Sequence, residues 1–172
     1  MSEPASGITI RPAQERDLPR LTEIYNHYVV NTPTTFDLDP YTVDQRREWF
    51  SHYHATGRHR LLVAEREGIV AGFTSSSRFH PRHAYDTTIE MTIVCAPEFV
   101  GFGIGQLLYE AIFDALKGED IHAAVALITL PNDASCAIHE RFGFGRAAVL
   151  EEVGRKFDQY WDVAWYYRRF GG

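Results

Sequence analysis

The glycine-rich stretch at residues 97–106, which reads P-E-F-V-G-F-G-I-G-Q, constrains the fold more than any other part of this chain. It joins a segment with the composition of a strand to an amphipathic segment of helical periodicity. Glycine permits positive φ angles and lets another molecule approach the backbone closely. Since the first amides of a helix lack partners within it, the stretch predicts an anion site that would suit a pyrophosphate. A tight strand-to-helix turn without a ligand is the simpler alternative.

Two better-known phosphate-binding loops fit this stretch poorly. A dinucleotide fingerprint, G-x-G-x-x-G, needs its third glycine at position 106 or 108, where the chain has Gln106 and Leu108. A Walker loop needs Gly-Lys followed by Ser or Thr, and the chain has none after these glycines. A nicotinamide-dependent oxidoreductase therefore rests on the glycines alone.

Hydrophobic periodicity predicts a single α/β domain over residues 1–172, with a loose start at residues 1–6. Helices are expected after Asp17 and after Thr42, where Gln45 completes a capping box. The nearly wholly apolar run at 123–130 predicts a strand covered on both faces. Further helices are expected at 104–116 and through Ser135 to Gly143, and strands at 8–11, 61–64, 69–73, 87–95, 123–130, 147–152 and 160–167. This order of elements predicts a mixed sheet flanked by helices.

Composition narrows the classes of partner. The net charge is -6 and no run of Lys or Arg stands out, which argues against a nucleic-acid partner bound through its phosphates. With no run of eighteen apolar residues and no charged-then-apolar leader, we expect no membrane contact and a cytoplasmic protein. Cys95 and Cys136 lack metal-ligand spacing, so we expect reduced thiols and no metal site.

Seven groups of residues, one of them in the glycine-rich stretch, occur in a characteristic order and spacing over about residues 8–168. They are Ile24-Tyr25-Asn26-His27-Tyr28, Val70-Ala71-Gly72, Arg82-His83-Ala84-Tyr85-Asp86 with Glu90, Gly103-Ile104-Gly105, Leu130-Pro131-Asn132-Asp133-Ala134-Ser135, His139-Glu140 with Gly143-Phe144, and Val153-Gly154 with Lys156-Phe157 and Asp162-Val163. In these groups the sequence resembles the GNAT superfamily of N-acetyltransferases, and within it the phosphinothricin acetyltransferase family.

The resemblance implies a mostly antiparallel central sheet whose fourth and fifth strands splay apart around acetyl-CoA. The pantetheine arm would pair with the backbone at Ile93, Val94 and Cys95. The pyrophosphate would rest on the amides of Gly101, Phe102, Gly103, Ile104, Gly105 and Gln106. Asn132 would contact the pantetheine and Arg141 the anionic end, although a helix N-cap and a solvated arginine are the competing interpretations. The family's usual Gln/Arg and Arg/Lys before the last two glycines are Val100 and Gly101 here.

Acetyl transfer to an amine requires removal of a proton from the ammonium, whose pKa is near 10. Glu90 lies in an otherwise apolar strand and is the candidate base, because an apolar environment raises a carboxyl pKa. Its alternative is a solvent-facing carboxylate. His139 shares a helix face with Ser135, and the family places there a histidine that acts as acid or base. Its alternative is a histidine packed against Phe142 or the last strands.

The resemblance also suggests residues that would bind the acceptor. Arg82 would hold a substrate carboxylate through paired hydrogen bonds, and Tyr85 would form a wall of the pocket. Arg78 and Thr129 are weaker candidates, and Phe36 would close over the site. Surface or packing roles are equally compatible with each.

The predicted function is transfer of acetyl from acetyl-CoA to the primary amine of a small amino acid or analogue of the phosphinothricin or methionine sulfoximine type. Another amine, such as a protein N-terminus or a polyamine, and a non-catalytic acyl-CoA sensor are the alternatives. The aromatic residues at 160–167 are too dense for one buried face. Since family members usually pair, we expect a homodimer.

Overall fold

The computed structural model describes residues 7–171, so the predicted loose start at residues 1–6 lies outside the described part of the chain. In chain order the elements are β1 (Ile8–Pro12), η1 (Glu15–Asp17), α1 (Leu18–Asn31), α2 (Val43–Ser51), β2 (Arg60–Arg66), β3 (Ile69–Arg78), η2 (His83–Tyr85), β4 (Thr88–Cys95), η3 (Pro97–Phe99), α3 (Ile104–Ala115), β5 (Ala123–Thr129), α4 (Asp133–Arg141), β6 (Gly145–Lys156) and β7 (Gln159–Arg169). Every predicted helix and strand is present.

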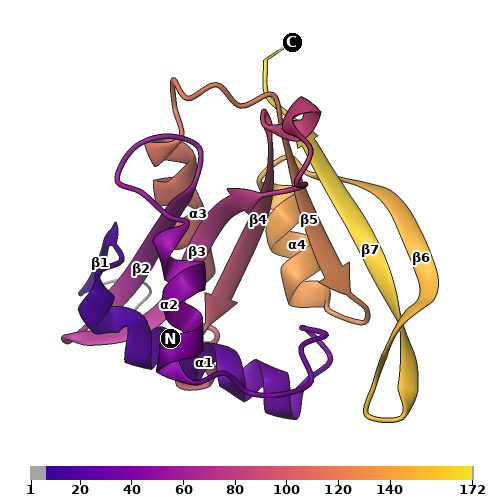
Figure 1. Ribbon diagram of the computed structural model, residues 1–172, viewed down its shortest axis with the longest axis horizontal. Coiled ribbons are helices and arrows are strands. Elements are labelled where there is room, and N and C mark those ends of the chain that lie inside the picture. Colours follow the sequence, from indigo (N-terminus) through magenta and orange to yellow (C-terminus); the bar gives the residue numbers. More distant parts are fainter. Residues whose placement is uncertain (1–6, 172) are drawn as a thin grey trace.

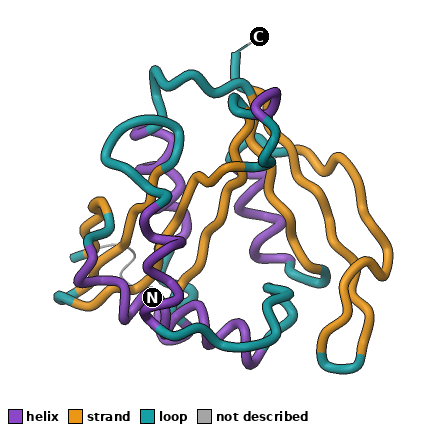
Figure 2. The backbone as a smooth tube through the Cα atoms, viewed as in Figure 1, coloured by secondary structure: helices purple, strands orange, loops and turns teal. Residues whose placement is uncertain are grey.

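The strands form one seven-stranded sheet in the order β1-β2-β3-β4-β5-β7-β6 (Figure 1). Neighbouring strands are antiparallel except for β4 and β5, which run parallel. Helices lie on both sides of the strands, as the backbone trace in Figure 2 shows. The predicted mixed, mostly antiparallel sheet flanked by helices is confirmed.

Alternation along the strands divides the apolar side chains between two cores. One core lies under α1 and α2 and includes Leu21, Val63 and Phe73. The other lies under α3 and α4 and includes the fully buried Tyr109 and Ile112. Because β4 runs through the middle of the sheet, its successive side chains point alternately toward α1 and α2 and toward α3 and α4.

The parallel pair β4–β5 is joined only at its N-terminal end. Three Cα pairs connect the strands, and the last of them is Glu90 with Val125. Beyond this point β4 continues along β3 to Cys95, while β5 continues along β7 to Thr129. The strands thus form a fork, and its two arms lead to the N-termini of α3 and α4 (Figure 1). The predicted splay of the fourth and fifth strands is confirmed.

The capping signals predicted for two helix starts have different outcomes in the structure. Thr42 and Gln45 form the predicted capping box. The Gln45 N–H donates to the Thr42 hydroxyl at 3.2 Å, and the Thr42 N–H donates to the Gln45 side-chain oxygen at 2.8 Å. Asp17 stands at the N-cap of α1, but its carboxylate does not cap the helix. It accepts hydrogen bonds from the Arg11 guanidinium at 2.7 and 2.8 Å and from the Gln14 N–H at 2.8 Å. The Asp17 carboxylate therefore forms an ion pair with Arg11 of β1 instead of capping α1.

The last two strands are longer than predicted. They form a hairpin that extends past the rest of the sheet and carries a bulge between Leu150 and Gly154. Glu152 in this bulge has a φ of 51°, and its N–H is bound by the Asp162 carboxylate at 2.8 Å. Because the bulge contains polar residues, the hydrophobic pattern of the sequence did not indicate that the strand continues through it. Within residues 7–171, no helix combines the length and the apolar character needed to cross a bilayer.

Candidate active site

Glu90 lies at the apex of the fork, because it is the last residue of β4 that pairs with β5. Its neighbours Ile89 and Met91 are buried in the core under α3 and α4. Since side chains alternate along a strand, Glu90 and Thr92 face the side of α1 and α2. The register of the sheet therefore brings a carboxylate to the point where the two strands separate.

Burial raises the pKa of the Glu90 carboxyl. Ser77 lies opposite on β3, and its hydroxyl donates to the Glu90 carbonyl oxygen at 3.3 Å. Residues 7–171 form no hydrogen bond to the Glu90 carboxylate. A carboxylate with a raised pKa is better matched to accept a proton near neutral pH. The environment fits the predicted general base, and that role stays a prediction.

The β4 arm of the fork offers backbone groups more than side chains. Ile93 and Val94 pack their side chains into the two cores. Gly72 lies opposite Cys95, and a Cβ there would be 2.8 Å from the Val94 carbonyl oxygen, so only glycine lets β3 approach this closely. The other edge of residues 91–95 pairs with no strand in the described part of the chain. An extended amide chain such as pantetheine fits this edge.

The glycine-rich loop prepares the N-terminus of α3 for an anion. Gly101 and Gly103 have φ angles of 90° and 74°, and an added Cβ at either would meet open space. The amides of the first turn, from Ile104 on, lack partners within the helix. One of them, the Gly105 N–H, bonds to the Cys95 thiol, whose pKa burial raises to about 11. The remaining amides suit a pyrophosphate.

The β5 arm carries Thr129 and Asn132. The Asn132 side chain caps α4 by accepting the Ser135 N–H at 3.2 Å, as its competing interpretation required. Thr129 is buried at the end of β5. Arg141 is exposed at the far end of α4, about 13 Å along the helix axis from its start. Asn132 and Thr129 therefore lie at the fork, whereas Arg141 does not lie at this end of α4.

His139 is buried, with 3% of its surface exposed, and both ring nitrogens are engaged. Nδ1 lies 2.7 Å from the Ser135 carbonyl oxygen and Nε2 lies 2.7 Å from the Tyr109 hydroxyl. A carbonyl only accepts, so Nδ1 carries the proton and Nε2 accepts from Tyr109. Burial lowers the pKa of His139, although the Ser135 carbonyl opposes this. The ring is neutral and links α4 to α3, so any proton exchange with the fork would pass through Tyr109.

The predicted acceptor-side loop lies at the N-terminal end of β4. Arg78 donates to the Pro81 carbonyl at 2.6 Å and pairs with Asp86 at 3.4 Å, so its charge is used within the loop. Tyr85 is 41% exposed and packs on His80, with ring centroids 4.6 Å apart. Arg82 is exposed, and its guanidinium has no ion pair or hydrogen bond to the described residues. Arg82 and Tyr85 therefore lie in the loop before β4, at the closed end of the fork, and both are exposed.

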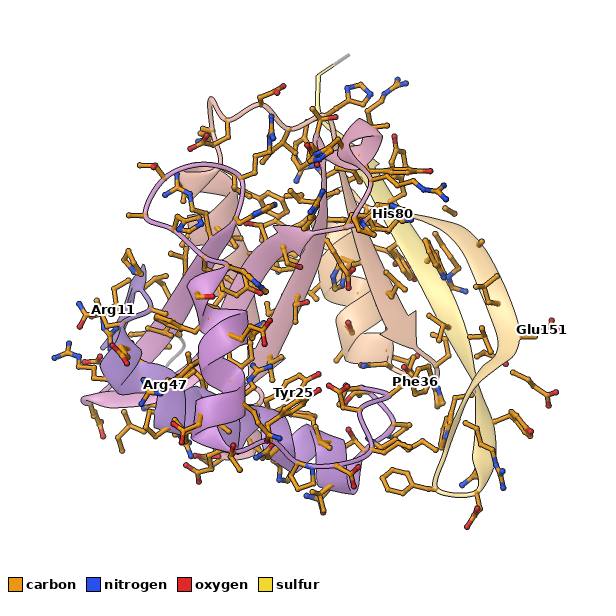
Figure 3. The ribbon with its side chains drawn as sticks, in the orientation of Figure 1. Arg11, Tyr25, Phe36, Arg47, His80 and Glu151 are labelled. Atoms are coloured by element: carbon orange, nitrogen blue, oxygen red, sulfur yellow. The ribbon has the colours of Figure 1, made fainter. Side chains whose placement is uncertain are left out.

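The connection between α1 and α2, residues 32–42, reaches across the open side of the fork (Figure 3). On its α1 side, the Tyr25 hydroxyl donates to Asp37 at 2.5 Å. Asn26 exchanges two hydrogen bonds of 2.8 Å with the backbone of Tyr41. Tyr25 and Asn26, two of the residues that carry the resemblance, therefore tie the connection to α1.

The same connection is fixed to the β6–β7 hairpin at its other side. The buried Lys156 ammonium donates to the Thr35 carbonyl at 2.8 Å. The ring of Phe36 lies against Gly154, where any added Cβ would overlap it. Phe36 and Thr129 are thus at the open end of the fork, while Arg78, Arg82 and Tyr85 are at its closed end. The structure places the five predicted acceptor residues in two sets with Glu90 between them.

The sequence did not predict a cavity of about 300 Å³ on the α1 and α2 side of the sheet. Its floor includes Ser77 and Thr92, the neighbours of Glu90, and its walls come from α1, α2 and the connection 32–42. Arg46 lines this cavity and is only 6% exposed. The missed signal is spacing, since Arg46 follows Val43 by three residues and so falls on the predicted apolar face of α2.

Comparisons with known proteins agree with this geometry. The model of the acetyltransferase (GNAT) family matches residues 21–144. The chain is 48% identical to a phosphinothricin N-acetyltransferase of Streptomyces coelicolor, over 94% of this chain and 95% of that protein. It is 30% identical to an L-methionine sulfoximine/L-methionine sulfone acetyltransferase of Pseudomonas aeruginosa, over 90% of each chain.

A solved structure shows the same fold with the predicted cofactor. It is a GNAT superfamily phosphinothricin acetyltransferase from Sinorhizobium meliloti in complex with AcCoA, 30% identical, with a TM-score of 0.89 over 96% of this chain and 90% of that one. Among residues 7–171, no three His, Cys, Asp or Glu side chains converge to hold a metal ion. The splayed strands, the glycine loop and the matched relatives therefore all agree with the predicted acetyltransferase chemistry.

Proposed function

This chain belongs to the GNAT family of acetyltransferases and uses acetyl-CoA, and from that premise we propose that its acceptor is the α-amino group of a small amino acid or analogue of the phosphinothricin or methionine sulfoximine type. The observation that carries the proposal is the half-buried carboxylate of Glu90 at the apex of the fork, next to the residues Ser77 and Thr92 that line a cavity of about 300 Å³. A cavity of this size suits an amino acid better than a protein segment.

Acetyl-CoA, when bound, supplies an acetyl thioester that is already activated for attack by an amine. The free edge of residues 91–95 would align the pantetheine arm, and the amides from Gly101 to Gln106 would hold the pyrophosphate. Glu90 would take the proton from the acceptor's ammonium, directly or through a water. The connection 32–42, held by Phe36 and Lys156, would keep bulk water from the open end of the fork.

His139 enters this proposal as a predicted catalytic residue that acts through another group. Its Nε2 accepts from Tyr109, so a proton would reach or leave the imidazole only along that hydrogen bond. The same bond ties α4 to α3 and would help to hold Asn132 at the start of α4 in position. Loss of His139 is expected to affect acetyl-CoA binding as well as turnover.

We also propose that the chain forms a homodimer through the β6–β7 hairpin. β6 is an edge strand whose residues are almost all exposed, and exposed strand edges are usually covered. Val149, Leu150 and Val153 on this edge are 39%, 41% and 55% exposed. A cytoplasmic location is part of the same prediction, and the two free cysteines support a reducing compartment.

The proposal is tested by following free-thiol release from acetyl-CoA with L-methionine sulfoximine, L-phosphinothricin, a polyamine and an N-terminal peptide. We expect release with the two amino acid analogues and little with the other amines. Glu90→Gln is expected to lower turnover by about 10²- to 10⁴-fold, the range for loss of a general base. Glu48→Gln, which neutralises an exposed carboxylate on α2, is the control and should match the wild type.

Two results would contradict the proposal. Release with the polyamine or the peptide alone would assign a different acceptor. No release with any amine, in a protein that binds acetyl-CoA, would indicate the acyl-CoA sensor. Turnover that Glu90→Gln leaves unchanged would refute only the role of Glu90 as the base.

A further inference from the structure

Arg46 on α2 carries a buried guanidinium with unmade hydrogen bonds. Only 6% of the residue is exposed, and neither Nε nor Nη2 has a hydrogen-bond partner in the described part of the chain. Burying a charge without a partner is costly, and proteins normally supply a carboxylate or a carbonyl. Arg46 lines the cavity of about 300 Å³, so its side chain borders a space that a small molecule can occupy, while Nε and Nη2 themselves are covered by the surrounding residues.

Aromatic rings stack on the guanidinium of Arg46. Its Cζ lies 3.7 Å from the ring centroid of Trp49, 4.4 Å from that of Tyr25 and 5.7 Å from that of Tyr41. Such stacking stabilises the cation and fixes its orientation, but it leaves the in-plane N–H groups free. A rigid guanidinium with free in-plane donors is suited to a planar pair of anionic oxygens.

The described residues do not provide that pair of oxygens themselves. The carboxylate of Asp37 also lines the cavity, but it accepts from the Tyr25 hydroxyl at 2.5 Å and forms no ion pair with Arg46. Arg46 therefore differs from its neighbour Arg47, which is exposed and pairs with Glu15 and Asp44. Figure 3 shows Arg47 on the outer side of α2.

The cavity connects Arg46 with the reaction centre. Ser77 and Thr92 form part of its floor, and these residues lie beside Glu90, one across the strand pair and one further along the same face. Tyr53 also lines the cavity, and its pKa is raised by burial and, to a smaller extent, by the charge of Glu90. A molecule in the cavity would therefore have one end at Arg46 and the other near Glu90.

We infer that Arg46 binds an oxyanion of the acceptor, a carboxylate or a phosphinate, while the amine of the same molecule is held near Glu90. This inference rests on the proposed function and deepens it, because it makes an anionic group a requirement for a good acceptor. Arg46 is a binding residue in this assignment and takes no part in proton transfer.

The test compares Arg46→Met with the wild type, using acceptors that differ only in their anionic groups. They are L-methionine sulfone, which has one carboxylate, its carboxamide, which has none, and L-phosphinothricin carboxamide, which keeps the phosphinate. We expect Arg46→Met to lower kcat/KM for methionine sulfone by about 10- to 150-fold through a higher KM, as for lost charge-assisted hydrogen bonds. Turnover of the uncharged carboxamide should change by less than about threefold.

The third acceptor identifies the source of the oxyanion. If Arg46 can also bind a phosphinate, phosphinothricin carboxamide will lose activity in Arg46→Met as methionine sulfone does. If Arg46 binds only the α-carboxylate, this amide will be unaffected by the substitution. Arg47→Met is the matched control and should leave all three acceptors unchanged, since its guanidinium is exposed.

A structural role for Arg46 predicts a different pattern. An equal loss for the charged and uncharged acceptors, or no loss for either, would overturn the inference. If Arg46→Met does not fold, Arg46→Lys keeps the charge but loses the planar fork, and the same selective rise in KM is expected.

Failure of the proposed function is distinguishable from failure of this inference. If the wild type acetylates no amine, the thermal shift produced by sodium propionate over sodium chloride still reports on Arg46. A shift in the wild type and in Arg47→Met that is absent in Arg46→Met would support the oxyanion site. Equal shifts in all three proteins would refute it.

Discussion

Burial shifts the two titratable side chains predicted for catalysis in opposite directions. It raises the pKa of Glu90, whose carboxylate lies at the apex of the fork, and it lowers the pKa of His139, whose nitrogens bind Tyr109 and Ser135. In both cases burial favours the neutral form. For Glu90 this makes a better base, whereas for His139 it removes the charge from a ring with no free nitrogen.

The pH dependence of turnover follows from the raised pKa of Glu90. The base acts only when ionised, so kcat/KM is expected to rise with pH through an apparent pKa above the ordinary carboxyl value of 4.5. A pH profile with L-methionine sulfone between pH 4 and 8 measures this limb. Glu90→Gln should remove it, and a profile in the variant with the same limb would assign the ionisation to another group.

At the scale of elements, the connection 32–42 is the part that ties the two halves of the fork together. It is bonded to α1 through Tyr25 and Asn26 and to β6 through Lys156 and Phe36. Because these contacts are few, a small change at one anchor should move the connection without unfolding the sheet.

Gly154→Ala tests the contact between this connection and the hairpin. The added Cβ would overlap the Phe36 ring, so the ring must leave its position. We expect the KM for the amino acid acceptor to rise by about fivefold or more, with the KM for acetyl-CoA unchanged. Gly145→Ala in the same strand is the control, because a Cβ there meets nothing within 4 Å. Equal effects of the two substitutions would refute a role for Phe36 in acceptor binding.

At the scale of the whole molecule, a chain with net charge -6 binds a strongly anionic co-substrate. The overall field opposes binding, so we expect the oriented amides of the α3 N-terminus to provide the attraction locally. This chain has Val100, which is 61% exposed, where its family usually has a polar or basic residue.

Val100→Arg is therefore expected to lower the KM for acetyl-CoA by about two- to fivefold at low salt, as expected for one exposed ion pair. The gain should vanish near 1 M salt, where exposed charges are screened. Steady-state kinetics at two salt concentrations measure it. Val30→Arg, at an exposed position on α1, is the control. No gain at low salt would show that the loop binds through its amides alone.

The proposed homodimer is also tested at this scale. Light scattering after size exclusion should give twice the chain mass for the wild type. Val153→Lys on the exposed edge of β6 is expected to give the monomer, whereas Val30→Lys, at a site of similar exposure on α1, should remain dimeric. A wild-type monomer at micromolar concentration would contradict the proposal.

The sequence by itself determined the elements, their order and the glycine-rich loop before α3. These features depend on local physics: apolar periodicity, the Thr42 capping box and the positive φ angles at Gly101 and Gly103. The resemblance named the residues of the fork, including Glu90 and Asn132, because their order and spacing are visible in one dimension.

Only the tertiary structure decided which side chains meet. The pairing of His139 with Tyr109 joins residues 30 positions apart, and the bond from Lys156 to Thr35 joins residues 121 positions apart. The unpartnered guanidinium of Arg46 is visible only once α1, α2 and the sheet enclose it. Burial and hydrogen bonding depend on neighbours that are distant in the chain, and these neighbours set whether a polar side chain is a cap, a link between helices or a binding group.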